Sequence, residues 1–335
     1  MKYPLRFQIF QFTHSFLSPF IYFYMKKNHL LILLFIVILL FIITHPGIST
    51  KAAFDGLLLW YQKLLPALLP LAILSNILVY SNYMQLITKY LYPLTRHLFK
   101  TSRNGCFALL GGILFGFPMG SKISGDLTVK HSITREEGEL LAICFNQLSP
   151  VFFSGYLLTS ILNLPELIPV SFLLLYLPPC IYARSKLRKR PFSNTKNAAS
   201  IPHLDFGMID AGIMNGFEAL TKLGGYIILF SIFASMLHTY NRHYPLVNLL
   251  LTGCVEVTTG ISYLKDTHLP LGFTYPLALF FASFGGLCGF AQTCSMTKEC
   301  GFSHRRYLIL RLIFAIISGL LGFICYRLFG SILCA

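Results

Sequence analysis

Long apolar runs separated by short basic segments are the feature that most constrains how this chain can fold. Each run approaches the length of a membrane-spanning helix, which needs about 20 apolar residues. Of the 335 residues, 55% are hydrophobic and 12% are charged, whereas soluble domains carry about 25% charged residues. The pattern excludes a soluble enzyme and predicts an all-α polytopic membrane protein with about seven to nine transmembrane helices. The apolar runs lie at 29–44, 57–80, 140–162, 165–183, 223–239, 273–295 and 307–329.

The positive charge of the chain has a regular distribution. The chain has 27 Lys and Arg residues against 12 Asp and Glu residues, a net charge of +15. The basic residues gather at 81–104, 184–205 and 296–306, between the runs. Lys and Arg favour cytoplasmic loops, so we expect these segments and the N-terminus to face the cytoplasm. The charge therefore indicates a lipid bilayer as partner, and no nucleic acid.

The N-terminal region is expected to form an uncleaved first span. Met25-Lys26-Lys27 precedes the first apolar run, but no Ala-x-Ala cleavage site follows before Lys51. Translation from Met1 or from Met25 is compatible with this pattern. The expected organisation is an N-terminal extension with the first span at 1–55, a first repeat with a connecting helix at 56–183, a basic cytoplasmic linker at 184–205, and a second repeat with a C-terminal helix at 206–335.

A short Gly-rich segment at 105–120 is expected to enter the membrane and fold back. If it crossed the membrane, Lys122 and the basic residues after it would lie outside, and every later loop would be inverted. As a helix the segment spans roughly 24 Å, less than the roughly 30 Å hydrocarbon core. Irregular backbone at membrane depth is tolerated only where protein or a water-filled cavity surrounds it. A re-entrant hairpin here therefore predicts a cavity.

The two halves of the chain carry a weak internal repeat. Each half has a span, a Gly-rich broken segment and a helix interrupted by polar residues. Gly120 and Gly260 are 140 positions apart, and Gly112 and Gly253 are 141 apart. An odd number of crossings between the halves would give two inverted repeats, the plan of secondary transporters whose sites lie at paired Gly/Pro-broken segments. The alternative is that these small residues only allow close helix packing.

Five motifs of the chain are Gly111-Gly112-x-x-x-Gly116-Phe117-Pro118-Met119-Gly120-Ser121-Lys122, Arg135-Glu136-Glu137, Phe145-Asn146-x-x-Ser149-Pro150-x-Phe152, Glu256-x-Thr258-Thr259-Gly260 and Phe284-Gly285-Gly286-x-x-x-x-x-Gln292. They resemble motifs of the YlbJ-like sporulation integral membrane proteins, which belong to the nucleoside-recognition (Gate) domain membrane proteins. Ser121 stands where this family leads us to expect Ala. The resemblance covers about 57–325 and implies a multi-pass protein of endospore-forming bacteria that is needed for spore cortex formation. It also implies a role in moving dipicolinate across the outer forespore membrane.

The first broken segment supplies candidate substrate-binding groups. Gly116, Pro118 and Gly120 can interrupt a helix and expose backbone N–H groups, and helix N-termini favour anions. Ser121 adds a hydroxyl donor, and Lys122 adds a full positive charge. An interfacial lysine that extends toward the headgroups is the alternative for Lys122. A dipicolinate dianion, or any carboxylate, would suit such a site.

Polar residues in the interrupted helices are further candidates, because polar groups at membrane depth must be paired or face a cavity. Asn146 and Ser149 are three residues apart and share a helix face beside Pro150. Gln147 is interpreted as a partner in helix–helix hydrogen bonding. Gln292 would hold the corresponding position in the second half.

Glu256 is the only acid within its apolar stretch, which makes it a functional candidate by default. We expect it to bind a coupling proton or cation, with the Thr258 and Thr259 hydroxyls and Gly260 beside it. A structural salt bridge between Glu256 and Lys122 is the alternative.

No metal or cofactor is predicted. The nine cysteines form no CxxC pair, and no catalytic triad order, Walker motif, HExxH or Rossmann fingerprint occurs. The expected function is that of a transporter of a small anionic metabolite, dipicolinate during sporulation, and not an enzyme. The alternatives are a nucleoside or other small polar metabolite transporter and a non-transporting scaffold of a forespore membrane complex. Copies of the same chain or other sporulation membrane proteins are expected as partners in the membrane.

Overall fold

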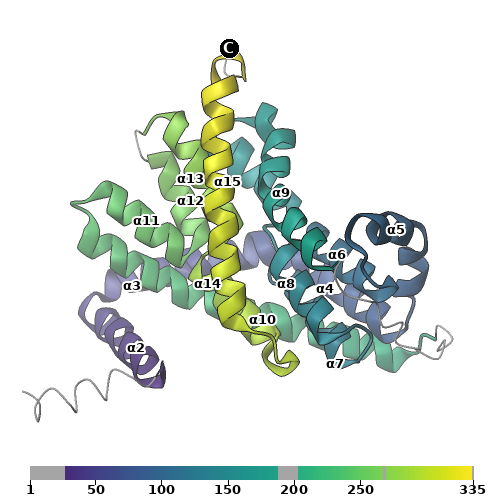
Figure 1. Ribbon diagram of the computed structural model, residues 1–335. Coiled ribbons are helices and arrows are strands. Elements are labelled where there is room, and N and C mark those ends of the chain that lie inside the picture. The colour runs from purple at the N-terminus through teal and green to yellow at the C-terminus, as the bar shows by residue number, and fades with distance from the viewer. Residues whose placement is uncertain (1–26, 188–202, 267–268, 334–335) are drawn as a thin grey trace, which may run out of the picture. The chain divides into compact units, whose positions relative to one another are not determined.

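The computed structural model describes residues 27–187, 203–266 and 269–333, which form helices and no strand (Figure 1). The chain divides into two compact units, residues 1–52 and 53–335. The first unit holds α2 (Lys27–Thr44) and the start of α3 (Pro46–Leu59). The extension before Lys27, and with it the question of Met1 or Met25, lies outside the described residues, as does most of the expected linker at 184–205.

The second unit is a bundle of long helices and shorter, interrupted ones. Its elements are η1 (Trp60–Leu64), α4 (Leu65–Tyr80), α5 (Met84–Phe99), α6 (Arg103–Phe115), α7 (Met119–Val129), α8 (Arg135–Cys144), η2 (Phe152–Ile161), η3 (Pro165–Leu167), α9 (Ile168–Leu187), α10 (Phe206–Asn241), α11 (Pro245–Val255), α12 (Val257–Asp266), α13 (Leu271–Phe284), α14 (Gly286–Met296), η4 (Lys298–Cys300) and α15 (His304–Leu333).

Within the described residues, five helical segments are long and apolar enough to cross a membrane, which confirms the prediction of an all-α, multi-pass membrane protein. The other two predicted spans, at 29–44 and 140–162, correspond to shorter apolar helices of 10–17 residues, so the count of seven to nine stays a prediction. The five segments are Pro46–Tyr80, Pro165–Leu187, Phe206–Asn241, Leu271–Met296 and His304–Leu328.

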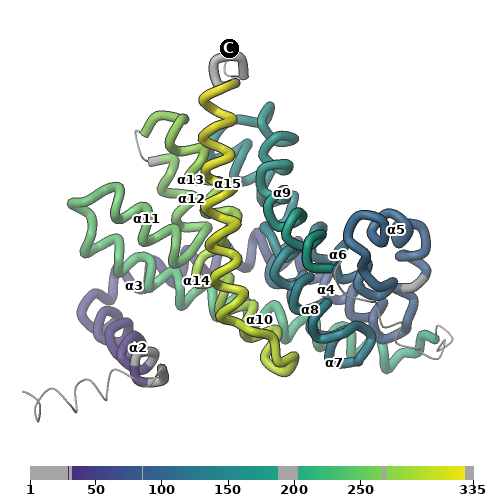
Figure 2. The backbone as a smooth tube through the Cα atoms, in the orientation of Figure 1, coloured from purple at the N-terminus to yellow at the C-terminus, as the bar shows by residue number. Residues whose placement is uncertain are grey.

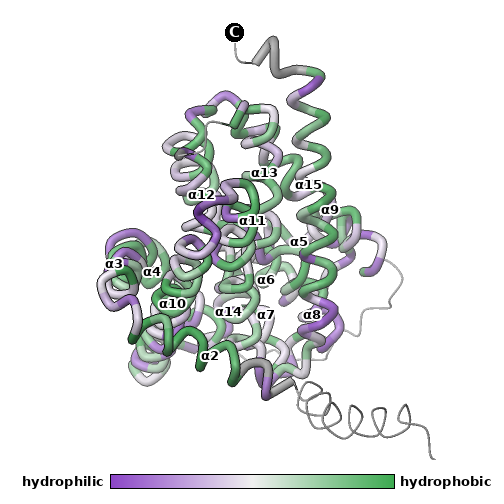
Figure 3. The backbone as a smooth tube through the Cα atoms, turned by 90° about the vertical axis from the view of Figure 1, so that its left-hand side faces the viewer, coloured by the Kyte–Doolittle hydropathy of each residue, from purple (hydrophilic) through white to green (hydrophobic). Residues whose placement is uncertain are grey.

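Helix α15 shows the inside-out pattern expected of a helix in lipid. It lies beside α13, and apolar residues follow most of its length (Figures 2 and 3). Leu312, Ile316 and Leu320 are 41–58% exposed, whereas the small residues Ala315 and Ser318 are fully buried. A soluble helix would bury the large apolar residues, so the exposed face of α15 is suited to hydrocarbon.

The segment predicted to fold back does reverse its direction. Helices α6 and α7 pack against each other, and the chain turns between them at Gly116, Phe117 and Pro118. Gly116 has a φ of 71°, which favours glycine. A Cβ on Gly120 would lie only 2.7 Å from the Cα atom of Gly112. The two glycines therefore allow the two helix backbones to touch.

A second helical hairpin is built in the same way. Helices α11 and α12 pack against each other, and the chain reverses at Glu256. A Cβ on Gly260 would overlap the Cα atom of Gly253. The two glycine pairs that match in the sequence thus hold equivalent places in two hairpins.

Each hairpin is followed by an interrupted helix, and the tip of the hairpin meets the interruption. In the first half, the Phe117 N–H donates to the backbone oxygen of Gln147, 2.7 Å away, between α8 and η2. In the second half, α13 ends at Phe284 and α14 begins at Gly286. The linking residue Gly285 and Gly286 have φ values of 77° and 71°. A Cβ on Gly286 would lie 3.2 Å from the backbone oxygen of Val255. Both tips are therefore fixed against breaks in neighbouring helices.

Helix α10 is longer than the predicted span at 223–239. It runs without interruption through the stretch 206–222, begins where the Asp205 carboxylate accepts from the Met208 N–H at 2.8 Å, and packs along α4. No proline separates the two parts, so the amphipathic stretch and the apolar run form one helix.

Candidate functional site

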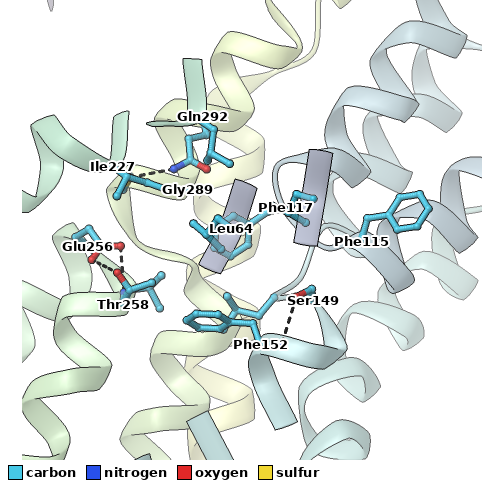
Figure 4. Close-up of a pocket in the computed structure, with 15 residues that line it drawn as sticks. Leu64, Phe115, Phe117, Ser149, Phe152, Ile227, Glu256, Thr258, Gly289 and Gln292 are labelled. Atoms are coloured by element: carbon cyan, nitrogen blue, oxygen red, sulfur yellow. Dashed lines mark hydrogen bonds between the residues drawn. The ribbon is translucent and has the colours of Figure 1, made fainter. Parts of the chain in front are cut away.

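A small cavity lies where the two hairpin tips and the two helix interruptions come together (Figure 4). About 40 Å³ of it is open to water, and a void of about 10–15 Å³ is enough for one water molecule. The cavity is thus large enough for a few waters, and a metabolite can enter only if its walls move apart. Its lining residues are Leu64, Leu68, Phe115, Phe117, Leu148, Ser149, Phe152, Leu223, Ile227, Glu256, Val257, Thr258, Cys288, Gly289 and Gln292.

Glu256 is the only charged residue in this lining and is 2% exposed. Its carboxylate caps α12: the N–H groups of Thr258 and Thr259 donate to it at 3.1 and 2.7 Å. The hydroxyls of Thr258 and Thr259 donate to the same carboxylate. These four donors hold the carboxylate in a fixed position at the cavity wall. Of the two threonines, only Thr258 also lines the cavity.

Gln292 and Ser149 bring further polar groups to the cavity from opposite halves of the chain (Figure 4). The Gln292 amide nitrogen donates to the Cys288 sulfur at 3.1 Å, while its oxygen has no hydrogen-bond partner among the described residues. Ser149 lies at the start of the helical stretch after the first interruption and accepts from the Phe152 N–H at 3.4 Å. Together with Thr258, these two residues are the uncharged polar candidates that line the cavity.

Asn146 and Ser121 do not line the cavity and hold the first half to the second instead. The Asn146 side chain accepts from the Ser121 N–H and donates to the hydroxyls of Thr293 and Tyr307, with distances of 3.1–3.2 Å. The Ser121 hydroxyl donates to the Pro118 oxygen at 2.7 Å. Both side chains are fully buried and satisfied, so the geometry gives them a positioning role.

Lys122 points away from the cavity. Its ammonium lies 2.7 Å from the Asp126 carboxylate, one helical turn further along α7. The alternative of a salt bridge between Lys122 and Glu256 is therefore wrong. An (i, i+4) pair on one helix face is the nearer solution for a buried lysine. Lys122 lines a separate cleft of about 630 Å³ together with charged residues of both signs, among them Asp126, Lys130, Glu218, Lys222, Lys298 and Glu299.

The remaining predicted residues shape the hairpin tips. Gly116 lies so close to Ser149 and Gln147 that a Cβ would overlap their backbones. Pro118 ends the first tip and precedes α7. Gly120 and Gly260 allow the helix contacts described above. None of these four residues lines the cavity; they set the backbone positions of the tips beside it.

Three residues near the cavity were missed or undervalued by the sequence prediction. Phe117 has no polar atom, so nothing in its chemistry marked it, although it lines the cavity. Gln147 was interpreted as a partner in helix–helix hydrogen bonding, but it is fully buried and neither atom of its amide finds a hydrogen-bond partner in the described part of the chain, so that interpretation is wrong. Arg311 lies within the run predicted as the last span. The presence of a charged residue inside that run was the signal that could have identified it.

The chain is similar to the sporulation integral membrane protein YlbJ of Bacillus subtilis (strain 168). The two are 27% identical over 328 residues, which cover 86% of this chain and 80% of that protein. No family model matches the chain, and no solved structure matches it. The similarity confirms the resemblance to YlbJ-like sporulation membrane proteins, whereas the Gate-domain assignment stays a prediction.

Proposed function

We propose that this YlbJ-like membrane protein is a transporter of a small anionic metabolite, and not an enzyme. The observation that carries the proposal is the buried cavity at which two helical hairpins and two interrupted helices meet. Secondary transporters bind substrate and coupling ions where discontinuous helices meet near the bilayer midplane. The Glu256 carboxylate, the hydroxyls of Thr258 and Ser149, and the Gln292 amide oxygen are the polar side-chain groups available there.

The two hairpins and the helices that follow them form, in this proposal, two inverted repeats. The matching glycine pairs at Gly112/Gly120 and Gly253/Gly260 support a common origin for the two hairpins. A re-entrant first hairpin also keeps the basic segments on one side of the membrane. Opposed repeats around one cavity would allow it to open alternately to the two sides.

Dipicolinate is the substrate that we propose, in the outer forespore membrane of a sporulating cell. The similarity to a sporulation membrane protein and the resemblance of the quoted motifs support this choice. A dianion cannot approach the Glu256 carboxylate without compensation, because like charges at short range repel. We therefore assign Glu256 the binding of a coupling proton or cation that accompanies the substrate.

The proposal is tested by reconstituting the full chain in liposomes with labelled dipicolinate, with and without an imposed proton gradient. We expect uptake above that of empty liposomes and a dependence of the rate on the gradient. Folded protein, verified by a monodisperse elution profile, that gives no uptake above empty liposomes would overturn the transporter assignment.

A transporter of nucleosides is the second candidate, favoured by one observation. The aromatic rings of Phe115, Phe117 and Phe152 line the cavity, and no basic residue does. Flat, neutral bases stack well on such rings. Labelled uridine and adenosine in the same liposomes separate the two: uptake of a nucleoside without uptake of dipicolinate would favour this candidate. A non-transporting scaffold predicts uptake of neither.

A further inference from the structure

Arg311 is a fully buried cation that forms no salt bridge within residues 27–187, 203–266 and 269–333. It is 1% exposed, and none of its three side-chain nitrogens finds a hydrogen-bond partner among the residues that the structure describes. Arg306, five residues earlier on α15, shows the contrast: it lies 3.2 Å from the Glu139 carboxylate and 3.2 Å from the Tyr182 hydroxyl. A guanidinium stays charged and offers five N–H donors. An uncompensated buried charge is costly, so this arrangement requires an explanation.

Arg311 does not extend toward the membrane surface. It lies on the buried face of α15 that also carries Ala315 and Ser318, opposite the exposed apolar residues. Its guanidinium lies 6.0 Å from the centre of the Tyr307 ring. The Tyr307 hydroxyl in turn accepts from the Asn146 amide at 3.2 Å. The positive charge is thus placed inside the protein, beside the network that holds the first helix interruption.

The guanidinium also lies beside the second interruption. A Cβ on Gly285 would be 3.5 Å from Nη2 of Arg311 and 3.4 Å from the Phe117 ring. Gly285 immediately precedes α14, a helix of 11 residues whose N-terminus has no side-chain cap. The uncapped N–H groups of a helix carry partial positive charge and bind anions. Phe117 is the link to the cavity, since it lines that cavity and also lies against Gly285 and Gly289.

We propose that Arg311 and the N-terminal N–H groups of α14 bind a carboxylate of the transported anion. This inference rests on the proposed function. Arg311 supplies the positive charge that the cavity lining lacks, since Lys122, the basic residue expected there, is paired with Asp126. A guanidinium matches a carboxylate with two parallel N–H···O bonds. Phe117 separates the cavity from Arg311 along the contacts described, so its ring must move for the carboxylate to reach the guanidinium.

Equilibrium binding to the purified full chain, in a phosphate-free neutral detergent, tests this assignment. The probes are labelled dipicolinate and its neutral counterpart pyridine-2,6-dicarboxamide. We expect Arg311→Gln to raise the Kd for dipicolinate at least tenfold and to leave the Kd for the diamide unchanged. Arg327→Gln is the matched control, because Arg327 lies on the same helix but is exposed. This control should bind both probes as the wild type does.

Thermal unfolding without ligand provides a second measurement that does not depend on the identity of the substrate. Because Arg311 is an uncompensated charge in the absence of an anion, Arg311→Met should raise the unfolding midpoint of the free protein and abolish the further rise caused by dipicolinate. A lower midpoint of the free variant would instead indicate a structural role and would overturn the assignment.

The outcomes separate this inference from the proposed function. Uptake of dipicolinate by the wild type together with unchanged binding by Arg311→Gln would overturn only the role of Arg311. If the wild type neither binds nor transports dipicolinate, the proposed substrate fails, and the midpoint of the free Arg311→Met protein still decides whether the charge is unpaired. Added phosphatidylglycerol identifies the other source of an anion: competition with dipicolinate at Arg311 would assign the site to a lipid headgroup and overturn the substrate role.

Discussion

The two helical hairpins share a frame, the close backbone contact that a glycine pair allows between their two helices, but they differ in the chemistry of their tips. In both, a pair of glycines brings the two helices into backbone contact, and the tip meets an interruption in another helix. The first tip is apolar and places the Phe117 ring against Gly285, beside Arg311. The second tip carries the Glu256 carboxylate, which is satisfied by the start of its own helix. A carboxylate held by four donors and a buried guanidinium without a hydrogen-bond partner among the described residues are thus associated with different tips.

This difference teaches that packing and ligand chemistry are carried by separate residues. The glycines set how closely the helices approach, and they can be common to both hairpins. The groups that contact a ligand need not be duplicated, because one cavity receives both tips. Substitutions can therefore disturb the shared frame, or either tip alone.

The largest effect is expected when the shared frame is broken. Gly120→Val and Gly260→Val each place a branched side chain against the backbone of the partner helix. We expect each to lower the free energy of unfolding by about 4 kcal/mol or more, the range reached when a core cannot accommodate a larger group. The yield of monodisperse protein after membrane extraction measures the effect.

Gly225→Val on α10 is the control for these variants, because nothing lies within 4 Å of a Cβ at that position. It should be extracted in wild-type yield. A hairpin that tolerates valine at Gly260 but not at Gly120 would show that the two frames are not equivalent, contrary to the comparison.

The second prediction compares the two interrupted helices. Asn146→Ala removes a side chain with three buried hydrogen bonds that connect Ser121, Thr293 and Tyr307. We expect it to lower the free energy of unfolding by about 2 kcal/mol, because partners of a buried amide are left unsatisfied. Gln292→Ala, which loses one bond to sulfur, should cost less than about 1 kcal/mol and should weaken ligand binding instead.

Denaturant titrations of both variants in detergent, together with the dipicolinate binding assay, distinguish these two roles. Equal losses of stability in the two variants would mean that Gln292 is also structural. Equal losses of binding, with stability intact, would place Asn146 in contact with the ligand.

The third prediction concerns the charge of the second tip. Glu256→Gln keeps the shape of the side chain but replaces the carboxylate that accepts from four donors with a neutral amide. We expect a loss of about 1–2 kcal/mol in the free energy of unfolding, the size of a helix-cap effect. We also expect uptake to lose its dependence on an imposed proton gradient.

Thr258→Val is the matched variant, since it removes one donor and leaves the carboxylate in place. It should retain the response to the gradient. Wild-type gradient dependence in Glu256→Gln would exclude this carboxylate as the coupling group while leaving its capping role intact.

Much of the hairpin frame could be predicted from the sequence, because backbone approach depends on residues that are recognisable one by one. The positive-inside rule required 105–120 to fold back, and the chain does reverse at Gly116. The partners of charged side chains could not be predicted, because they depend on which helix face meets which neighbour. Lys122 was expected at the site, yet it pairs with Asp126 on its own helix. Arg311 received no role, because only packing shows that it faces inward.

The smallest effect is expected at the base of the first hairpin, where the buried acid is Glu137. Glu137, on α8, is buried and accepts from the Ser102 N–H at 2.6 Å, just before α6 begins. Burial raises its pKa above the ordinary value of 4.5, against the opposing effect of the bond from Ser102. The folded state therefore retains the proton to higher pH than the unfolded chain does. Stability should decline as the pH rises from about 4.5 through the raised pKa.

Glu137→Gln should remove this decline, because the amide is neutral at every pH and its oxygen can still accept from Ser102. The difference between variant and wild type should be absent in acid and should grow to a constant gain for the variant above the raised pKa. Glu136→Gln, an exposed neighbour on the same turn, should leave the pH profile of unfolding unchanged. A wild-type protein that instead gains stability as the pH rises from 4.5 would mean that the Ser102 bond outweighs burial. The carboxylate at the base of the first hairpin would then be ionised in the folded protein.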